Sequence, residues 1–450
     1  MSDTPVTDTP LTDAEVMQAI TAAFDATRWQ DIVDLTDAWL EARGELPGPA
    51  AHFRAAGLQG VGRLEEAVPW AEVAVASITP PKHGLDPSAV PYFAALVGLG
   101  QALAITGHTD KAMRVYREAL RTPVLLPESL ASKAHLRLAI KPKQWRKAWL
   151  EHEARLLDTK SKNGVPGVPV WDGKPTDGPV VVLHEQGIGD AVLFARWLPL
   201  LAERSGHPVI WVGEKMFHRY IAAIPGVTSC VTVPEAFEEV GEALRLREGS
   251  CYIRAMSLPH RFACTPQNVP APVAPPFPRS PLASGKVRVG VCWEGSKTAH
   301  HNFDRSLSPD VASLLWADSP SEVEWVSLQY NTEPPEGAPF AKMGEGDLYD
   351  TTERIASCDF VVTVDTSVFH VAASLGVPTI VLPPMTVDWR YSGWPGGMRT
   401  LWYPSAVVIR RESARETAAQ VRSARAVLHD VVLALRHPAI SLPVTASSAT

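Results

Sequence analysis

The sequence predicts a chain of mixed class, in which an N-terminal array of helices precedes two α/β halves of the Rossmann type. Residues 13–160 are rich in Ala, Leu and Glu and show almost no strand signal, whereas short apolar runs alternate with helical stretches after residue 179. A proline-dense segment divides that alternation in two. We expect a disordered tail at 1–12, the helical array at 13–160, a first α/β domain at 161–278, a second at 279–436 and a tail at 437–450.

Length and composition exclude several classes of protein. At 450 residues the chain exceeds one ordinary core, and 46% hydrophobic with 20% charged residues is typical of a globular protein. No apolar run reaches the roughly 18 residues of a membrane span, and the acidic, proline-rich N-terminus is unlike a secretory or transit signal. A net charge of -7 argues against nucleic acid as the main partner. Five cysteines without a C-x-x-C pair predict buried, reduced thiols in a cytoplasmic protein, and no metal site.

The helical array carries a repeat with a period of 34 residues, as in tetratricopeptide arrays. The positions that fit are Leu96, Leu99, Gly100, Leu103, Ala112, Tyr116 and Ala119 in one copy and Ala55, Ala67, Ala71 and Ala74 in an earlier one. Each helix pair must stack on a neighbour to bury its other face, so we expect a solenoid, irregular at the insertion 79–88. Its concave surface predicts a protein or peptide partner, and a structural spacer or dimer interface is an equal alternative.

The first α/β half opens on a strand, a glycine turn and a helix. The apolar run 180–183 ends at the turn, and the helix is expected to begin at or near Asp190. Ligands of such sheets bind beyond the carboxyl ends of the strands. We therefore expect Gln186, Gly187 and Gly189 to let the backbone approach a ligand, with the Asp190 carboxylate at the mouth of the crevice. Further strands are expected at 208–212, 228–233 and 250–255, and an irregular linker at 267–285.

The second half has its own strand-to-helix junction. A strand stops at Asp365, and Thr366 or Ser367 caps the helix that follows. The exposed N–H groups and positive end of such a helix suit a diphosphate, and Asp365 could accept hydrogen bonds from sugar hydroxyls. His370, one turn into the helix, either points at the ligand or packs inside. Strands are expected at 287–293, 322–329, 359–364, 378–384 and 406–411, and a closing amphipathic helix at 414–435.

Two loops complete the candidate site. One follows the strand at 287–293 and contains Gly295, which we expect to line the cleft, and Ser306, which we expect to contact the ligand. Its cations Lys297 and Arg305 would neutralise a departing nucleoside diphosphate without a metal, and a solvated loop with Arg305 paired to a carboxylate is the alternative. The other loop contains Asp388, where ligand contact and ordinary loop stabilisation are equally expected.

Taken in order, these motifs resemble the heptosyltransferase-like family of glycosyltransferases, family 9, in the bacterial variety that carries an N-terminal tetratricopeptide array. The resemblance runs from about 145 to 435. It is carried by WDG (171–173), EQGIGDAVLFARWLPLL (185–201), SLP (257–259), W-x-G (293–295), RS (305–306), VSLQ (326–329), VTVDTSVFHVAASLGVPTIVLPP (362–384), DWR (388–390) and WYPS (402–405). The array is also similar in architecture to that of the O-linked N-acetylglucosamine transferases.

The resemblance implies a GT-B fold, a nucleotide-diphosphate sugar as donor, no further cofactor, and metal-independent transfer with inversion. It also implies that Asp190 is the general base on the acceptor hydroxyl and that the segment 365–370 contacts the donor. The histidines in 293–306 and the spacing in 383–397 depart from the family pattern, so the sugar and base of the donor stay open. The leading hypothesis is transfer to a protein or peptide held by the array. The alternatives are transfer to a cell-surface glycan or lipid-linked saccharide, and a scaffold without activity.

Overall fold

The computed structural model describes residues 12–157, 165, 167–232, 249–278, 285–296, 302–391 and 398–436. The chain divides into two compact units. The first comprises residues 1–129 with the short segment 297–303, and the second comprises 130–296 and 304–450. Within the described residues, no helix combines the length and the apolar character that crossing a bilayer requires.

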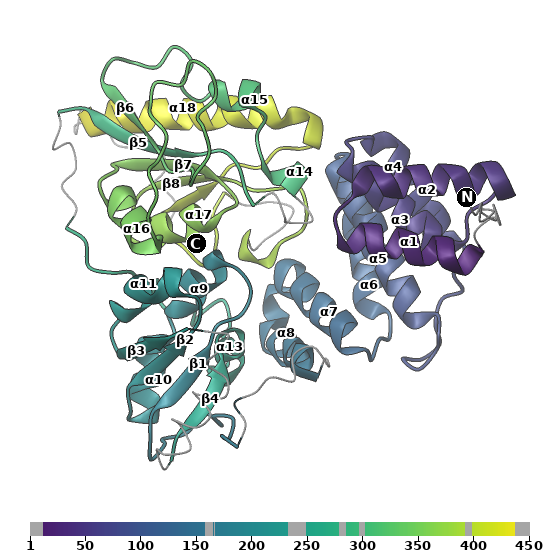
Figure 1. Cartoon of the computed structure of the whole chain (residues 1–450), viewed down its shortest axis with the longest axis horizontal. Coiled ribbons are helices and arrows are strands. Elements are labelled where there is room, and N and C mark those ends of the chain that lie inside the picture. Colours follow the sequence, from purple (N-terminus) through teal and green to yellow (C-terminus); the bar gives the residue numbers. More distant parts are fainter. Residues whose placement is uncertain are drawn as a thin grey trace, which may run out of the picture. The chain divides into compact units, whose positions relative to one another are not determined.

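The first unit is built of helices (Figure 1). They are α1 (Asp13–Asp25), α2 (Trp29–Arg43), α3 (Gly48–Gly60), α4 (Leu64–Ala76), α5 (Ala89–Ile105) and α6 (Thr109–Arg121). Every position that the repeat pattern selects is buried. Gly100 shows why small residues are needed, since a Cβ there would lie 2.4 Å from Cε1 of Tyr116. The insertion 79–88 contains no helix or strand, as expected. The assignment of these helices to the tetratricopeptide class stays a prediction.

Two helices that the sequence placed in the array pack instead with the α/β part. From residue 130 onward, α7 (Pro127–Ile140) and α8 (Trp145–His152) belong to the second unit, so the boundary falls at 129 rather than at 160. Aromatic contacts explain why these helices pack with the α/β part. The ring of Trp145 stacks on that of Trp402 at 5.1 Å, and the Trp149 ring meets the Trp389 ring edge-on at 5.5 Å. Helical periodicity alone does not reveal which partner a tryptophan face will meet.

The second unit contains two Rossmann-like lobes, each with an all-parallel sheet. In the first lobe the strand order is β3-β2-β1-β4, and in the second it is β6-β5-β7-β8-β9. The strands are β1 (Val180–Leu183), β2 (Val209–Val212), β3 (Val227–Val231), β4 (Cys251–Arg254), β5 (Val287–Cys292), β6 (Val323–Ser327), β7 (Phe360–Val364), β8 (Thr379–Leu382) and β9 (Ala406–Val408). Each lies within a few residues of a predicted strand. Both lobes of the predicted doubly wound architecture are therefore present.

The helices of the two lobes follow the sequence expectations with one exception. They are α9 (Ile188–Ala195), α10 (Leu198–Ser205), α11 (His218–Ala222) and α13 (Leu258–Arg261) in the first lobe, and α14 (Asn302–Arg305), α15 (Pro309–Ser313), α16 (Leu348–Ala356), α17 (Ser367–Ser374) and α18 (Thr417–Arg436) in the second. The exception is the helix expected to run from Asp190 to Leu201, which breaks between α9 and α10. Pro199 sits in the first turn of α10, where its missing N–H costs nothing.

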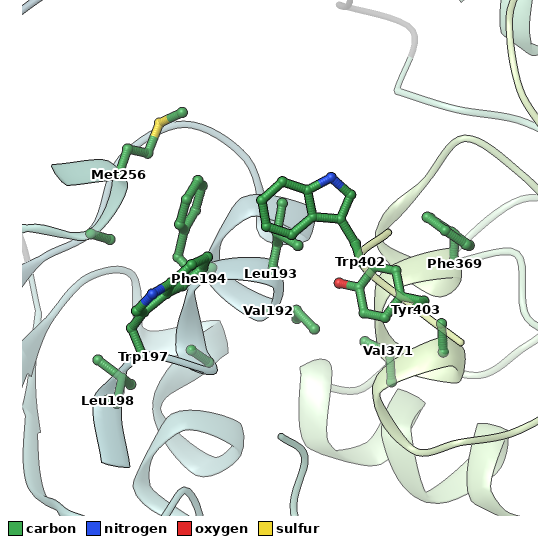
Figure 2. Packing of buried hydrophobic residues seen from close by; sticks show 14 of the residues in the cluster. Val192, Leu193, Phe194, Trp197, Leu198, Met256, Phe369, Val371, Trp402 and Tyr403 are labelled. Carbon is green, nitrogen blue, oxygen red and sulfur yellow. The ribbon is translucent and has the colours of Figure 1, made fainter. Parts of the chain in front are cut away.

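The two lobes share one hydrophobic core. Helix α9 packs against α17, and a single cluster of buried side chains runs from one lobe into the other. Figure 2 shows Val192 and Leu193 of α9 facing Trp402 and Tyr403 of the second lobe. The Arg196 guanidinium also links the two lobes, because it donates a hydrogen bond to the carbonyl oxygen of Trp402 at 2.9 Å. The two lobes therefore contact each other through packed, buried side chains.

The linker and the cysteines also agree with the sequence. Residues 267–278 form no helix or strand, yet they are anchored, since the Pro270 carbonyl accepts a hydrogen bond from Arg196. All five cysteines are free, and all except the half-buried Cys230 are buried. Burial raises the pKa of the Cys292 thiol to about 11, so this residue is an inert, protonated thiol near neutral pH.

Candidate active site

Strand order places the candidate site. In the first lobe the chain winds from β1 outward to β3 and then crosses to β4 on the other side of β1, and in the second it crosses from β6 to β7 on the other side of β5. Open α/β sheets bind ligands at such reversals, beyond the carboxyl ends of the strands. The turn 184–190 follows β1, and Asp365 follows β7. Both predicted turns therefore stand at the position where open α/β sheets bind their ligands.

Asp190 lies in the first turn of α9 and caps its own helix. Its Oδ2 accepts a hydrogen bond from the backbone N–H of Gly187 at 3.3 Å. The positive end of α9 is thus already occupied by a carboxylate of the same helix. The residue is 8% exposed, so the carboxylate is largely withdrawn from water. Gln186, which precedes this turn, adopts a positive φ of 64°, an uncommon conformation for a residue with a side chain.

The other oxygen of Asp190 is held from the second lobe. Its Oδ1 accepts from Nη2 of Arg390 at 2.5 Å, and Nη1 of the same guanidinium donates to Oδ2 of Asp388 at 2.9 Å. Burial opposes the charge of Arg390, but Asp190, Asp388 and Asp365 outweigh it and raise the guanidinium pKa well above its ordinary value. Asp388 therefore belongs to this charge cluster, and its predicted contact with the donor stays a prediction. Arg390, which the sequence placed only in a loop of undecided role, is the central cation of the cluster.

Asp365 is the second carboxylate of the site. Its Oδ1 accepts from the Tyr391 hydroxyl at 2.5 Å, and its Oδ2 lies 3.7 Å from Nη1 of Arg305. Burial and the charge of Asp388 raise the pKa of Asp365, while Tyr391, Arg305 and Arg390 act in the opposite direction. Arg305 thus pairs with a carboxylate, as the alternative has it, and its predicted contact with a departing diphosphate stays a prediction. Its Nε, however, is buried with no hydrogen-bond partner among the described residues.

The N-terminus of α17 differs from that of α9 because it carries no internal anion. Thr366 is the N-cap residue, yet its side chain makes no capping hydrogen bond, and the first turn contains no acidic residue. The Thr366 hydroxyl instead meets that of Thr363 at 3.2 Å. Ser367 opens the helix and is partly exposed. The N–H groups of this turn thus lack a side-chain acceptor within the described structure, which is the arrangement that binds phosphate groups.

His370 occupies the interior, which corrects its prediction as a donor contact. It is 3% exposed, and its Nδ1 is hydrogen-bonded to the Tyr403 hydroxyl at 2.9 Å. A Cβ on Gly189 would lie 2.6 Å from Cδ2 of His370, so the glycine lets α9 and α17 approach each other. Burial, with Arg390 and Arg196, lowers the His370 pKa far enough to keep the ring neutral. The second of the two readings open in the sequence, packing inside, is the one that the structure supports.

The loop after β5 is shaped by a residue that the sequence analysis did not select. Gln329, at the end of β6, accepts through Oε1 from the backbone N–H of Glu294 at 2.9 Å and donates to the Glu294 carbonyl at 3.1 Å. Ser306 accepts from the Gly295 N–H at 3.0 Å, so its observed role is to hold this loop. Gln329 is the last residue of the VSLQ motif, which is the sequence feature that could have identified it. Lys297 lies outside the described residues, and its predicted contact with the donor stays a prediction.

Helices α7 and α8 bring two histidines close to this charge cluster. The His135 ring stacks on Trp389 at 6.2 Å and lies 4.9 Å from the His152 ring. Burial first, and then the charge of Arg390, lower the His135 pKa to about 4. Sequence reasoning missed both histidines because they sit in the helical region, far along the chain from either turn. Among the described residues no three His, Cys, Asp or Glu side chains gather as a metal ion would require.

Fold and site together define a class of protein with two Rossmann-like lobes, whose strand reversals bring one charge cluster together. Comparison with known proteins finds a family similarity in the second lobe. Residues 314–410 match the family model described as Glycosyltransferase family 9 (heptosyltransferase). The matched segment contains Asp365, the start of α17 and Arg390. Over this segment the second lobe is therefore similar to glycosyltransferases of the heptosyltransferase-like kind.

Similarity to individual proteins is more distant. The chain is 24% identical over 345 residues to protein FlbA of Caulobacter vibrioides, which covers 66% of this chain and 55% of FlbA, so the chain spans about half the length of that curated relative. A family 9 glycosyl transferase from Veillonella parvula is 13% identical, with a TM-score of 0.40 over 59% of this chain and 99% of the other. An O-GlcNAc transferase of Thermobaculum terrenum is 15% identical, with a TM-score of 0.34 over 95% of this chain and 94% of the other.

Proposed function

We propose that this protein transfers a sugar from a nucleoside-diphosphate donor to an acceptor hydroxyl with inversion at the anomeric carbon. One observation carries the proposal: two helix N-termini meet at the strand reversals, one already filled by its own carboxylate and the other open to an anion. The first supplies a base, and the second supplies a seat for a diphosphate.

In this mechanism the acceptor hydroxyl binds beside Asp190. Its oxygen attacks the anomeric carbon from the face opposite the leaving group and forms the new glycosidic bond, while its proton passes to the Asp190 carboxylate. The bond between the anomeric carbon and the diphosphate oxygen breaks, and its electron pair leaves with the nucleoside diphosphate. The negative charge that develops is met by the N–H groups at Thr366 and Ser367 and by the guanidinium of Arg305.

Donor chemistry can be tested without knowing the acceptor. ADP, CDP, GDP and UDP are added separately to the whole protein, and the unfolding temperature and heat of binding are measured. A ligand that binds only the folded state must raise its stability, so at least one nucleotide is expected to raise the unfolding temperature. Release of nucleoside diphosphate from the matching nucleotide sugars then measures turnover. If no nucleotide binds and no nucleotide sugar is hydrolysed, the scaffold alternative replaces the enzyme.

We propose that the acceptor is a protein or peptide bound by the helical unit. The buried repeat positions support it, because paired helices stacked side by side commonly expose an extended surface for a chain. The test incubates the intact protein and a radiolabelled nucleotide sugar with a cell extract, followed by separation of protein, lipid and glycan. Label in the protein fraction supports the proposal. Label confined to lipid or glycan favours the cell-surface alternative, in which the array docks the enzyme.

A further inference from the structure

Arg390 joins the two halves of the site, and the mechanism above does not use it. It follows β8 in the second lobe, yet one Nη binds Asp190 of the first lobe while the other binds Asp388. Its guanidinium also lies over the Trp389 ring, 4.6 Å from the centroid. The forked guanidinium group is thereby held in one plane, and each of its two terminal nitrogens (its arms) binds a carboxylate. Arginine suits this geometry because its parallel N–H groups match two acceptor oxygens.

This arrangement leaves Asp190 unready to act as a base. Oδ2 accepts from Gly187 and Oδ1 accepts from Arg390, so both oxygens already have donors. The two side chains are also withdrawn from water, with exposed fractions of 10% for Asp190 and 16% for Arg390. An acceptor that arrived first would meet an occupied base.

A bound diphosphate would change the balance around Arg390. The site contains three carboxylates (Asp190, Asp365 and Asp388) and two guanidinium groups (Arg305 and Arg390). A further anion at the start of α17 adds negative charge beside Asp365, whose pKa is already raised by burial and by Asp388. Of the two cations, Arg390 has both arms committed to carboxylates and Arg305 retains a free Nε. Arg305 offers one unpartnered donor, so further neutralisation of a diphosphate by the cations of this site requires an Arg390 arm to move from carboxylate to phosphate.

We propose that Arg390 is shared between the base and the donor, so that the diphosphate of the donor draws Arg390 away from Asp190 and frees that carboxylate for the acceptor. The inference rests on the proposed function, and it adds an order: the donor binds first, and the base becomes competent only afterwards. Arg390 is a positioning residue for Asp190 and a binding residue for the diphosphate. It thereby suppresses proton abstraction when no donor is present.

Binding of inorganic pyrophosphate and of the four nucleoside diphosphates tests this coupling without any turnover. In the wild-type protein Asp190 competes for Arg390, so Asp190→Asn is expected to tighten pyrophosphate binding about tenfold, within the range of ordinary coupling between sites. In an Arg390→Met background the same Asp190→Asn change is expected to have little effect, because the shared partner is gone. The four affinities form a double-mutant cycle that isolates the pair.

Two further variants keep the test decisive. Arg390→Met leaves the buried Asp190 and the partly buried Asp388 without their guanidinium partner and can prevent folding. Arg390→Lys, which keeps the charge but not the fork, is therefore measured beside it. Asp350→Asn removes one negative charge from an exposed pair with Arg219 and reports the effect of net charge alone. It is expected to leave the affinity unchanged.

The outcomes separate this inference from the function on which it rests. If a nucleotide or pyrophosphate binds and Asp190→Asn tightens it only when Arg390 is present, the sharing is supported. If binding occurs but Asp190→Asn has the same effect with and without Arg390, then Arg390 is a fixed tie between the lobes and the inference is wrong, while the transferase proposal stands. If neither pyrophosphate nor any of the four nucleotides binds, the proposed function itself fails.

Discussion

The N-termini of α9 and α17 occupy equivalent positions in their lobes but differ in charge: a carboxylate binds the N-terminus of α9, and none lies in the first turn of α17. Each follows a buried parallel strand at a reversal of strand order, and each begins with an N-cap residue that makes no side-chain cap. At α9 the third helical residue, Asp190, returns to the N-cap N–H and supplies the anion that a helix start attracts. At α17 no acidic residue lies in the first turn, and the carboxylate of Asp365 precedes the cap.

This difference teaches how one fold assigns two roles to its two halves. A helix that carries its own carboxylate has no place for a phosphate, but it presents that carboxylate at a fixed position. A helix without one keeps its N–H groups for a ligand. Position in the fold is therefore common to both turns, and in the proposed mechanism the identity of one residue in the first helical turn decides which is the base side and which the donor side. The predictions below probe this division, beginning with the largest expected effect.

Removing the charge of Asp190 tests the base side most directly. The variant Asp190→Asn keeps an oxygen for the Gly187 N–H but cannot accept the acceptor proton. Transfer is expected to fall by roughly 10²–10⁴-fold, the usual contribution of a general base. Initial rates of transfer measure the loss. Nucleotide binding is expected to persist in the same variant, since the proposed donor site lies on α17. A variant that keeps its transfer rate would remove Asp190 from the base role.

The two glycines of the first turn are a matched pair for stability. A Cβ at Gly189 would lie 2.6 Å from Cδ2 of His370, whereas at Gly187 the nearest atom is Oδ2 of Asp190 at 3.8 Å. Gly187 also has an extended backbone, with φ -91° and ψ 174°, which alanine adopts without strain. We expect Gly189→Ala to reduce the free energy of unfolding by about 1–3 kcal/mol through overpacking. Gly187→Ala should change it by less than about 1 kcal/mol.

Chemical denaturation of both variants measures this difference. Equal stabilities would mean that α9 and α17 do not approach as closely as the packing of Gly189 on His370 requires. A large loss in Gly187→Ala instead would identify Gly187 as the glycine of close contact. The sequence treated the two glycines alike, as backbone that a ligand could approach, and the structure separates them.

Much of the fold and the outline of the site could be predicted from the sequence, because both depend on local patterns. Strand β1, the glycine turn and Asp190 are adjacent in the chain, as are β7, Asp365 and the start of α17. Short-range periodicity and helix-cap chemistry identify such units. The rule that ligands bind at the carboxyl ends of parallel strands then places them at one crevice.

The contacts that join these units could not be predicted, since they link residues far apart in the chain. Arg390 meets Asp190 from 200 residues away, and His135 reaches the site from a helix that looks like the rest of the array. His370 illustrates the same limit. Its place in the helix was known, but whether it faced a ligand or the interior depended on Gly189 and Tyr403, which no local pattern connects to it.

Removing Arg305 tests the donor side. Its unpartnered Nε and its contact with the Asp365 backbone carbonyl at 3.3 Å place it beside the open end of α17. Charged hydrogen bonds contribute about 1.5–3 kcal/mol, so Arg305→Ala is expected to weaken nucleotide binding by roughly tenfold or more. Calorimetric titration measures the affinity. Arg288→Ala, which removes a partly exposed pair with Glu324 in the same lobe, is the control and should leave the affinity unchanged. Equal effects would show that Arg305 acts only through the net charge of the lobe.

Asp365 offers the smallest and most specific test, through the pH dependence of stability. Burial and the charge of Asp388 raise its pKa above the ordinary value of 3.8, so the folded protein favours the protonated carboxyl more than the unfolded chain does. A carboxyl group of this kind supports the fold fully below the ordinary pKa, and that support is lost as the pH rises through the raised one. At neutral pH the ionised carboxylate therefore lowers the free energy of unfolding, and the neutral amide in Asp365→Asn avoids this loss.

We accordingly expect Asp365→Asn to unfold at a temperature higher than wild type by about a few degrees at pH 7, an ordinary shift for a small gain in stability. The gain should shrink as the pH approaches 3.8 from above, because wild-type Asp365 then becomes neutral as well. Thermal unfolding across this range, with both proteins in the same buffers, measures the difference. A variant less stable than wild type at pH 7 would mean that Arg305 and Tyr391 compensate the carboxylate fully. A gain that is lost towards acid pH would show that the donor side, unlike the self-capped start of α9, retains a destabilising charge for the sake of its ligand.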